Sequence, residues 1–177
     1  NEEFTLQNLT SSLAKRNAGG GKEFSVVHLA SHFRLAPNWS DSFLLIGGGK
    51  ILTLEAMTTS PEIDFTDDEL VTLSACNTAT GDLSNGGEVD GLAGVIQTKK
   101  GKSVLATLWE VQDDSTSALM SNFYRSRQAN PEKTKIDALV NAQKSMLYGS
   151  STPKPAIPNN GPKFRKDTTR PFAHPAY

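Results

Sequence analysis

The sequence has almost no cysteine: Cys76 is the single one among 177 residues. One thiol cannot form an internal disulfide, so the fold does not depend on the cross-links that stabilise small secreted domains. A lone thiol is either a small buried hydrophobe or a reactive group. A single cysteine at the end of a strand is more often a buried structural residue than a reactive one. The neighbouring residues must decide between these two roles for Cys76.

An excess of charge of either sign is lacking as well. The 18 basic and 19 acidic residues leave a formal net charge of -1, which provides no electrostatic footprint for nucleic acid or an anionic membrane. No apolar run reaches the ~20 residues needed to cross a bilayer, although 37% hydrophobic residues suffice for one core. We therefore expect a soluble, cytoplasmic domain without a nucleic-acid or membrane partner. Because residue 1 is Asn, we expect this domain to be a piece of a longer protein.

Short apolar segments alternate with helical patterns along the chain. The segments 24–29, 42–46, 70–75 and 104–108 are typical of β-strands. Apolar residues with helical spacing occur in 4–16 and in three later groups: Leu92, Val95 and Ile96; Leu119, Met120 and Phe123; Ile136, Leu139, Val140 and Leu147. This alternation predicts an α/β fold with a mostly parallel sheet sandwiched between helices.

The composition changes near residue 150. Six prolines and five basic residues lie in 150–177, against the one acidic residue Asp167. Proline at this density is incompatible with a continuous helix or central strand. The sequence therefore predicts a domain over 1–149, which begins with the N-terminal helix, and a Pro-rich basic loop or tail over 150–177.

Histidine and cysteine follow two of the predicted strands. Residues 26–33 read VVHLASHF and contain His28 and His32, and residues 70–82 read LVTLSACNTATGD and contain Cys76. Residues just beyond neighbouring parallel strands converge at one edge of the sheet, so we expect His32 and Cys76 to meet there. An adjacent imidazole would activate a thiol whose ordinary pKa is about 8.5. His28 lies inside the apolar segment and is predicted to be a hydrogen-bonded core histidine.

Four motifs in this order resemble a known family. They are VVHLASHF, SFLLIGGGKILTLEAM (42–57), LVTLSACNTATGD and GEVDGLAGVIQTKKGKSVLATLWEVQDDSTSALMSNFY (87–124). Together they resemble the CHAT domain, a branch of the caspase and separase-like cysteine peptidases. The resemblance implies a caspase-like fold and a cysteine endopeptidase that cleaves a protein substrate. It also implies that no cofactor or metal is required, and that tetratricopeptide repeats are a possible neighbour on the parent chain.

The same resemblance implies the roles of individual residues. The second histidine of the first motif and the cysteine of the "LSAC" motif form the family's catalytic dyad, which maps onto His32 and Cys76. Backbone N–H groups of Phe33 and Cys76 are the expected oxyanion donors. Phe33 stands where the family often has Gly, and we expect it to crowd the substrate. The family pattern continues into a last apolar strand, which we expect to be missing after Tyr177.

Other residues near these motifs are candidates for a substrate pocket. The candidates are Asp82, Asp90, Trp109 and Asp113, and the three carboxylates among them would favour a basic side chain of the substrate. In the alternative reading, the acidic residues are helix caps or solvated charges.

Two further functions stay open at this point. One is a catalytically inactive caspase-like module that mediates protein–protein interaction. The other is a zinc site formed by His28, His32 and Cys76, since two imidazoles and a thiolate are a known ligand set. Selective labelling of the thiol tests the first alternative, and metal analysis tests the second.

Overall fold

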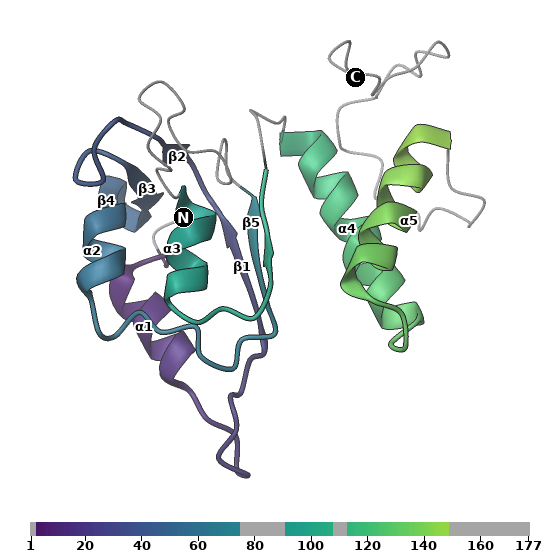
Figure 1. Cartoon of the computed structure of the whole chain (residues 1–177), viewed down its shortest axis with the longest axis horizontal. Helices are drawn as coiled ribbons and strands as arrows, with labels where there is room; N and C mark the ends of the chain where they lie inside the picture. The colour runs from purple at the N-terminus through teal and green to yellow at the C-terminus, as the bar shows by residue number, and fades with distance from the viewer. Residues whose placement is uncertain (1–2, 75–90, 108–112, 149–177) are drawn as a thin grey trace. The chain divides into compact units, whose positions relative to one another are not determined.

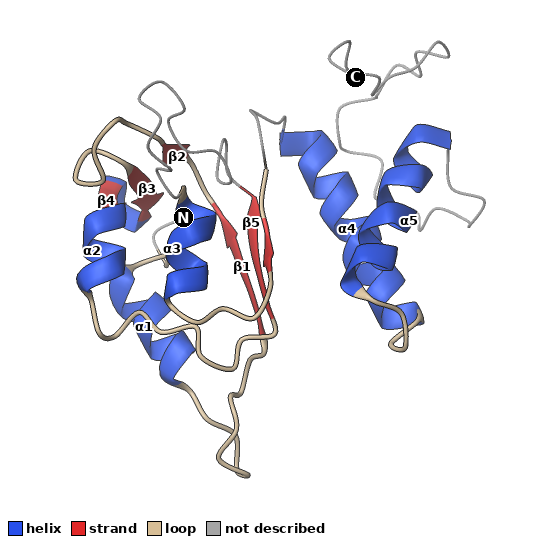
Figure 2. Cartoon of the chain, viewed as in Figure 1, coloured by secondary structure: helices blue, strands red, loops and turns tan. Residues whose placement is uncertain are grey.

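The computed structural model describes residues 3–74, 91–107 and 113–148 of the chain (Figure 1). The chain divides into two compact units, Asn1–Val111 and Gln112–Tyr177. Within the described residues, all strands belong to the first unit, and the second unit consists of two helices (Figure 2).

A parallel sheet of three strands lies in the first unit. Its strands are β1 (Val26–Ala30), β5 (Leu70–Ser74) and β6 (Val104–Leu105), in the order β1-β5-β6. The register of β1 against β5 is constant: residue 26 pairs with residue 70 and residue 30 with residue 74, an offset of 44. Apolar and β-branched residues dominate these strands, as is typical of buried parallel sheets. The prediction of an α/β fold with a parallel sheet is confirmed.

The segment 42–46 forms a strand, but in a second and antiparallel sheet. This sheet has the order β2 (Phe33–Arg34), β3 (Phe43–Ile46) and β4 (Lys50–Thr53). The turn η1 (Gly47–Gly49) joins β3 to β4, with φ of 69° at both Gly48 and Gly49. Glycine adopts this left-handed conformation without a Cβ clash, and so short a connection can join only antiparallel strands. The prediction of one mostly parallel sheet was therefore wrong for this segment, and β2 and β4 were missed.

In the described part of the first unit, three α-helices accompany the strands. They are α1 (Leu6–Ala14), within the predicted 4–16, α2 (Leu54–Thr59), which the sequence analysis missed, and α3 (Leu92–Thr98). The Thr53 hydroxyl accepts a hydrogen bond of 3.0 Å from the Ala56 N–H and caps α2. This cap supplies a partner for one of the backbone donors that a helix start leaves unpaired.

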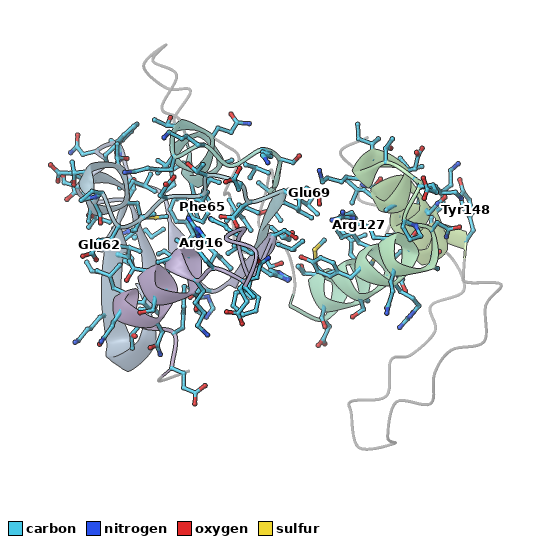
Figure 3. All side chains as sticks on the ribbon, turned by 90° about the horizontal axis from the view of Figure 1, so that it is seen from below. Arg16, Glu62, Phe65, Glu69, Arg127 and Tyr148 are labelled. Atoms are coloured by element: carbon cyan, nitrogen blue, oxygen red, sulfur yellow. The ribbon has the colours of Figure 1, made fainter. Side chains whose placement is uncertain are left out.

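The main core lies between one face of the parallel sheet and α1, α2 and α3 (Figure 1). Leu29, Val71 and Leu73 of the sheet face this core, and Phe65 is completely buried in it (Figure 3). The core also contains Leu9, Leu13, Phe33, Leu44, Ile46, Leu52, Leu54, Met57, Ile63, Leu92, Val95 and Ile96. The helices of this unit cover the core-facing side, and coverage of both faces stays a prediction.

The described part of the second unit, 113–148, is a helical hairpin of α4 (Asp113–Ala129) and α5 (Lys135–Tyr148), both of which the apolar spacing predicted. Phe123 of α4 and Ala138 and Ala142 of α5 are buried. Burial of apolar residues on both helices is expected where two amphipathic helices pack against each other. Tyr148 ends α5 and projects from it (Figure 3), with 82% of its surface exposed.

A buried ion pair lies where the chain enters β5. Lys22 Nζ is 2.5 Å from Asp68 Oδ2, and the two side chains are 5% and 1% exposed. Lys22 Nζ also donates a 3.3 Å hydrogen bond to the carbonyl of Asp64. Asp68 Oδ1 is buried and has no partner within the described part of the chain. Burial raises the pKa of Asp68, and the hydrogen bond and charge of Lys22 oppose that rise.

Candidate functional site

The carboxyl ends of β1 and β5 lie side by side. Ala30, the last residue of β1, pairs with Ser74, the last residue of β5. His32 follows Ala30 by two positions in the sequence, and Cys76 follows Ser74 by two positions. Cys76 lies outside the described residues. A site that uses both residues would therefore lie at the carboxyl ends of β1 and β5.

Two hydrogen bonds fix the backbone on either side of the predicted catalytic histidine. The Ser31 hydroxyl donates to the Leu45 carbonyl over 2.5 Å, and the Leu45 N–H donates to the His32 carbonyl over 2.8 Å. Both bonds attach the loop between β1 and β2 to β3 of the small sheet. The side chain of His32 is exposed. An exposed imidazole on a fixed backbone can exchange protons with a ligand and keep its place, as an acid/base group requires.

Phe33 contributes its side chain to the core and turns its amide away from β3. The side chain is 8% exposed and packs in the main core, so the expectation that it crowds the substrate is wrong. The bond from Leu45 to His32 makes these two a hydrogen-bonded pair, so the next pair, Phe33 with Leu44, is not hydrogen-bonded. The Phe33 N–H therefore points away from β3 and is not used in that ladder.

His28 differs from its prediction in one respect. It is hydrogen-bonded, as expected: its Nε2 lies 2.6 Å from Oγ of Ser74 on the neighbouring strand. It is exposed, however, so its assignment to the core was wrong, because the alternation along β1 turns Leu29 to the core and His28 to the opposite face. Desolvation by surrounding protein atoms lowers the pKa of His28 below its ordinary value of 6.5.

Ser74 is a site residue that the sequence analysis missed. Alternation places Ser74 on the face of β5 opposite Leu73, which faces the core. The same rule places His28 on the opposite face from Leu29. Alternation along each strand, combined with the register of β1 against β5, would have placed these two polar residues side by side, but the sequence does not give that register.

The remaining predicted site residues are not brought together by the described structure. Asp82, Asp90 and Trp109 lie outside the described residues, and Asp113 is the first residue of α4 in the second unit. Their role in a substrate pocket stays a prediction. Among residues 3–74, 91–107 and 113–148, no three His, Cys, Asp or Glu side chains gather into a group that could hold a metal ion.

The topology thus defines an α/β domain in which the loop that carries His32 follows β1, the first strand of the parallel sheet. The family model of the CHAT domain matches residues 1–177, which is the whole chain. The chain therefore belongs to the CHAT domain family, a family of caspase-like, peptidase-related domains, and the resemblance found in the motifs is confirmed. A search of curated proteins finds no match to it. None of the helices in the described ranges is both long enough and apolar enough to span a membrane.

Proposed function

We propose that this domain is a cysteine endopeptidase with a caspase-like fold, which cleaves a protein substrate with Cys76 as nucleophile and His32 as acid/base. The observation that carries the proposal is the register of β1 against β5. The offset of 44 between paired residues equals the separation of His32 and Cys76 in the sequence. The two residues thus follow adjacent parallel strands at equal distances from the last pair.

Equal offsets matter because of the dimensions of a sheet. Neighbouring strands lie about 4.8 Å apart and each residue advances about 3.3 Å along its strand. If the segments after Ala30 and Ser74 kept this spacing for two residues, the side chains of His32 and Cys76 would come within reach of one hydrogen bond or one bridging substrate atom. This supports a nucleophile and base that act on the same carbonyl group.

The proposed reaction proceeds through an acyl-enzyme. The Cys76 thiol gives its proton to the His32 imidazole, and the thiolate forms a C–S bond with the peptide carbonyl carbon. The resulting oxyanion accepts hydrogen bonds from backbone N–H groups, for which Phe33 and Cys76 are the proposed donors. The C–N bond then breaks, and His32 protonates the departing amine. His32 next takes a proton from water, whose oxygen displaces the thiol and releases the carboxyl product.

Two features support the assignment of His32 and Phe33. His32 is exposed and its backbone is held by β3, so its imidazole is accessible to substrate. The Phe33 N–H points away from β3 and is not used in pairing with that strand. Its side chain is buried in the core, so the ring would not block a substrate carbonyl that accepts a hydrogen bond from this N–H. Asp82, Asp90, Trp109 and Asp113 are the proposed candidates for a substrate pocket, in which a carboxylate would favour a basic side chain before the scissile bond.

The test compares Cys76→Ala and His32→Ala with the wild type, each as the whole chain. Cys76→Ala should abolish cleavage of a peptide library with little change in melting temperature. His32→Ala should lower turnover by roughly two to four orders of magnitude, the usual range for a general acid/base. It should also slow alkylation of Cys76 by iodoacetamide at neutral pH. His174→Ala is the control, because it removes a different one of the three histidines.

Retained cleavage by Cys76→Ala contradicts the mechanism. A thiol that reacts at the rate of an ordinary cysteine in wild type and His32→Ala alike, together with no cleavage of any library member, instead supports the inactive interaction module.

A further inference from the structure

The side chains of His28 and Ser74 connect the two strands that lead to the proposed dyad. Nε2 of His28 and Oγ of Ser74 are 2.6 Å apart, which is within the range of a short hydrogen bond. Ser74 precedes Cys76 by two positions, and His28 precedes His32 by four. The contact lies on the face of the sheet opposite the main core.

We propose that His28 and Ser74 are a positioning pair, which holds the carboxyl ends of β1 and β5 in the alignment that the reaction of Cys76 needs. This inference rests on the proposed function, because it assigns His28 and Ser74 to the same edge. Neither residue is proposed to touch the substrate.

The direction of the bond supports a positioning role. The backbone partner of His28 is Thr72, not Ser74. The imidazole therefore reaches diagonally across the two strands, toward their carboxyl ends, to the neighbour one pair-spacing further on its own face. A diagonal link changes its length when one strand slides along the other. A slip of one residue, about 3.3 Å, would break it.

The pair also complements the attachment of the other half of the site. On the side of β1, the Ser31 and Leu45 hydrogen bonds fix the backbone around His32 to the small sheet. On the side of β5, the hydroxyl of Ser74 is bound to His28. The first set holds the histidine-bearing loop to β3, and the second links the strand end that precedes Cys76 to β1.

Four variants test the pair. His28→Leu and Ser74→Ala each remove the bond, the double variant removes both partners, and His28→Gln keeps a polar group at a similar distance from the backbone. Each single loss should slow iodoacetamide alkylation of Cys76 and lower kcat by about tenfold, the factor that corresponds to one net hydrogen bond. KM should change little. The double variant should be no slower than either single variant, and His28→Gln should recover most of the rate.

The control is Thr53→Ala, which removes a side-chain hydrogen bond of similar size from the cap of α2. If the His28–Ser74 bond only stabilised the fold, Thr53→Ala would slow alkylation and turnover as much as His28→Leu and Ser74→Ala do. Additive losses in the double variant, equal slowing by Thr53→Ala, or no recovery by His28→Gln would each overturn the proposal.

The ring nitrogen signals of His28 give a readout that does not depend on turnover. Ser74→Ala should shift the Nε2 resonance of His28, and an unchanged resonance means that the bond is absent and the positioning pair is wrong. If instead His32→Ala leaves alkylation and cleavage unchanged, the proposed dyad fails. The alkylation rates of the His28 and Ser74 variants still decide whether the pair controls Cys76.

Discussion

Replacement of Lys22 by Met is expected to destabilise the first unit more than the loss of any surface charge. Lys22 Nζ is 2.5 Å from Asp68 Oδ2, with both side chains almost completely buried, and Met retains most of the volume of the lysine stem. The change leaves the Asp68 carboxylate buried without its cation, and the other carboxylate oxygen already has no partner among the described residues. Removal of one member of a buried pair costs about 3 to 5 kcal/mol of unfolding free energy.

A neighbouring ion pair provides a matched control. Lys102 Nζ lies 3.4 Å from Asp67 Oδ1, but these side chains are 59% and 66% exposed. Exposed pairs contribute about 0 to 1 kcal/mol, so Lys102→Met should barely change the stability. Urea unfolding of both variants, followed by circular dichroism, measures the two losses. Equal losses for the two variants, or less than about 1 kcal/mol for Lys22→Met, would refute the assignment of a buried and energetically coupled pair.

The pH dependence of the same variants adds a second check. Burial raises the pKa of Asp68 above its ordinary value of 3.8, although Lys22 opposes the rise. A carboxyl group whose pKa is higher in the folded than in the unfolded state stabilises the fold at a pH below its unfolded-state pKa. This contribution is lost as the pH rises through its folded-state pKa. In Lys22→Met the pKa of Asp68 should be raised further, because the opposing charge and hydrogen bond of Lys22 are gone. The deficit of Lys22→Met relative to wild type should therefore shrink as the pH is lowered from about 7 toward 4. A deficit that grows on acidification would show the opposite sign.

Three further changes test the packing and the turns. Phe65→Ala removes a completely buried ring and should cost about 3 to 5 kcal/mol in urea unfolding. Gly101→Ala would place a Cβ 2.8 Å from Cγ2 and 3.2 Å from the carbonyl of Ile96; it should cost about 1 to 3 kcal/mol, and a variant as stable as wild type would contradict that clash. Thr53→Ala loses the bond from the Ala56 N–H and should lower the unfolding free energy by about 1 kcal/mol, measured by thermal melting.

The parallel sheet and the long helices were predictable because their signals are local and strong. The apolar segments at 26–30 and 70–74 have no other residue pattern that competes with a buried strand, and α4 and α5 keep their apolar spacing over several turns. The small sheet was harder. β2 has only two residues, Phe33 and Arg34, and is a strand because β3 pairs with it, which no local propensity reveals.

The chemistry of the proposed site was assigned from motifs and stays a prediction, whereas the register of its two strands could not be assigned at all. The motifs point to His32 and Cys76, yet the sequence alone does not show that residue 30 pairs with residue 74. The assignment of His28 failed because an apolar segment was treated as buried on both faces. In the described structure, Leu29 faces the core and His28 faces away from it. Phe33 was misjudged for a related reason, since its side chain and its amide point in different directions.

The glycine turn between β3 and β4 has a consequence for the order in which the domain folds. This hairpin closes over three residues, whereas β1 has to find a partner 44 positions away. Loop closure costs more entropy for longer separations, and local pairings form faster than distant ones. On a ribosome, β1 to β4 emerge before β5, so the loop that carries His32 can take its shape on the small sheet first. β5, which leads to Cys76, joins later, so the strand pairing on which the proposed site depends is completed only after the histidine-bearing loop has formed.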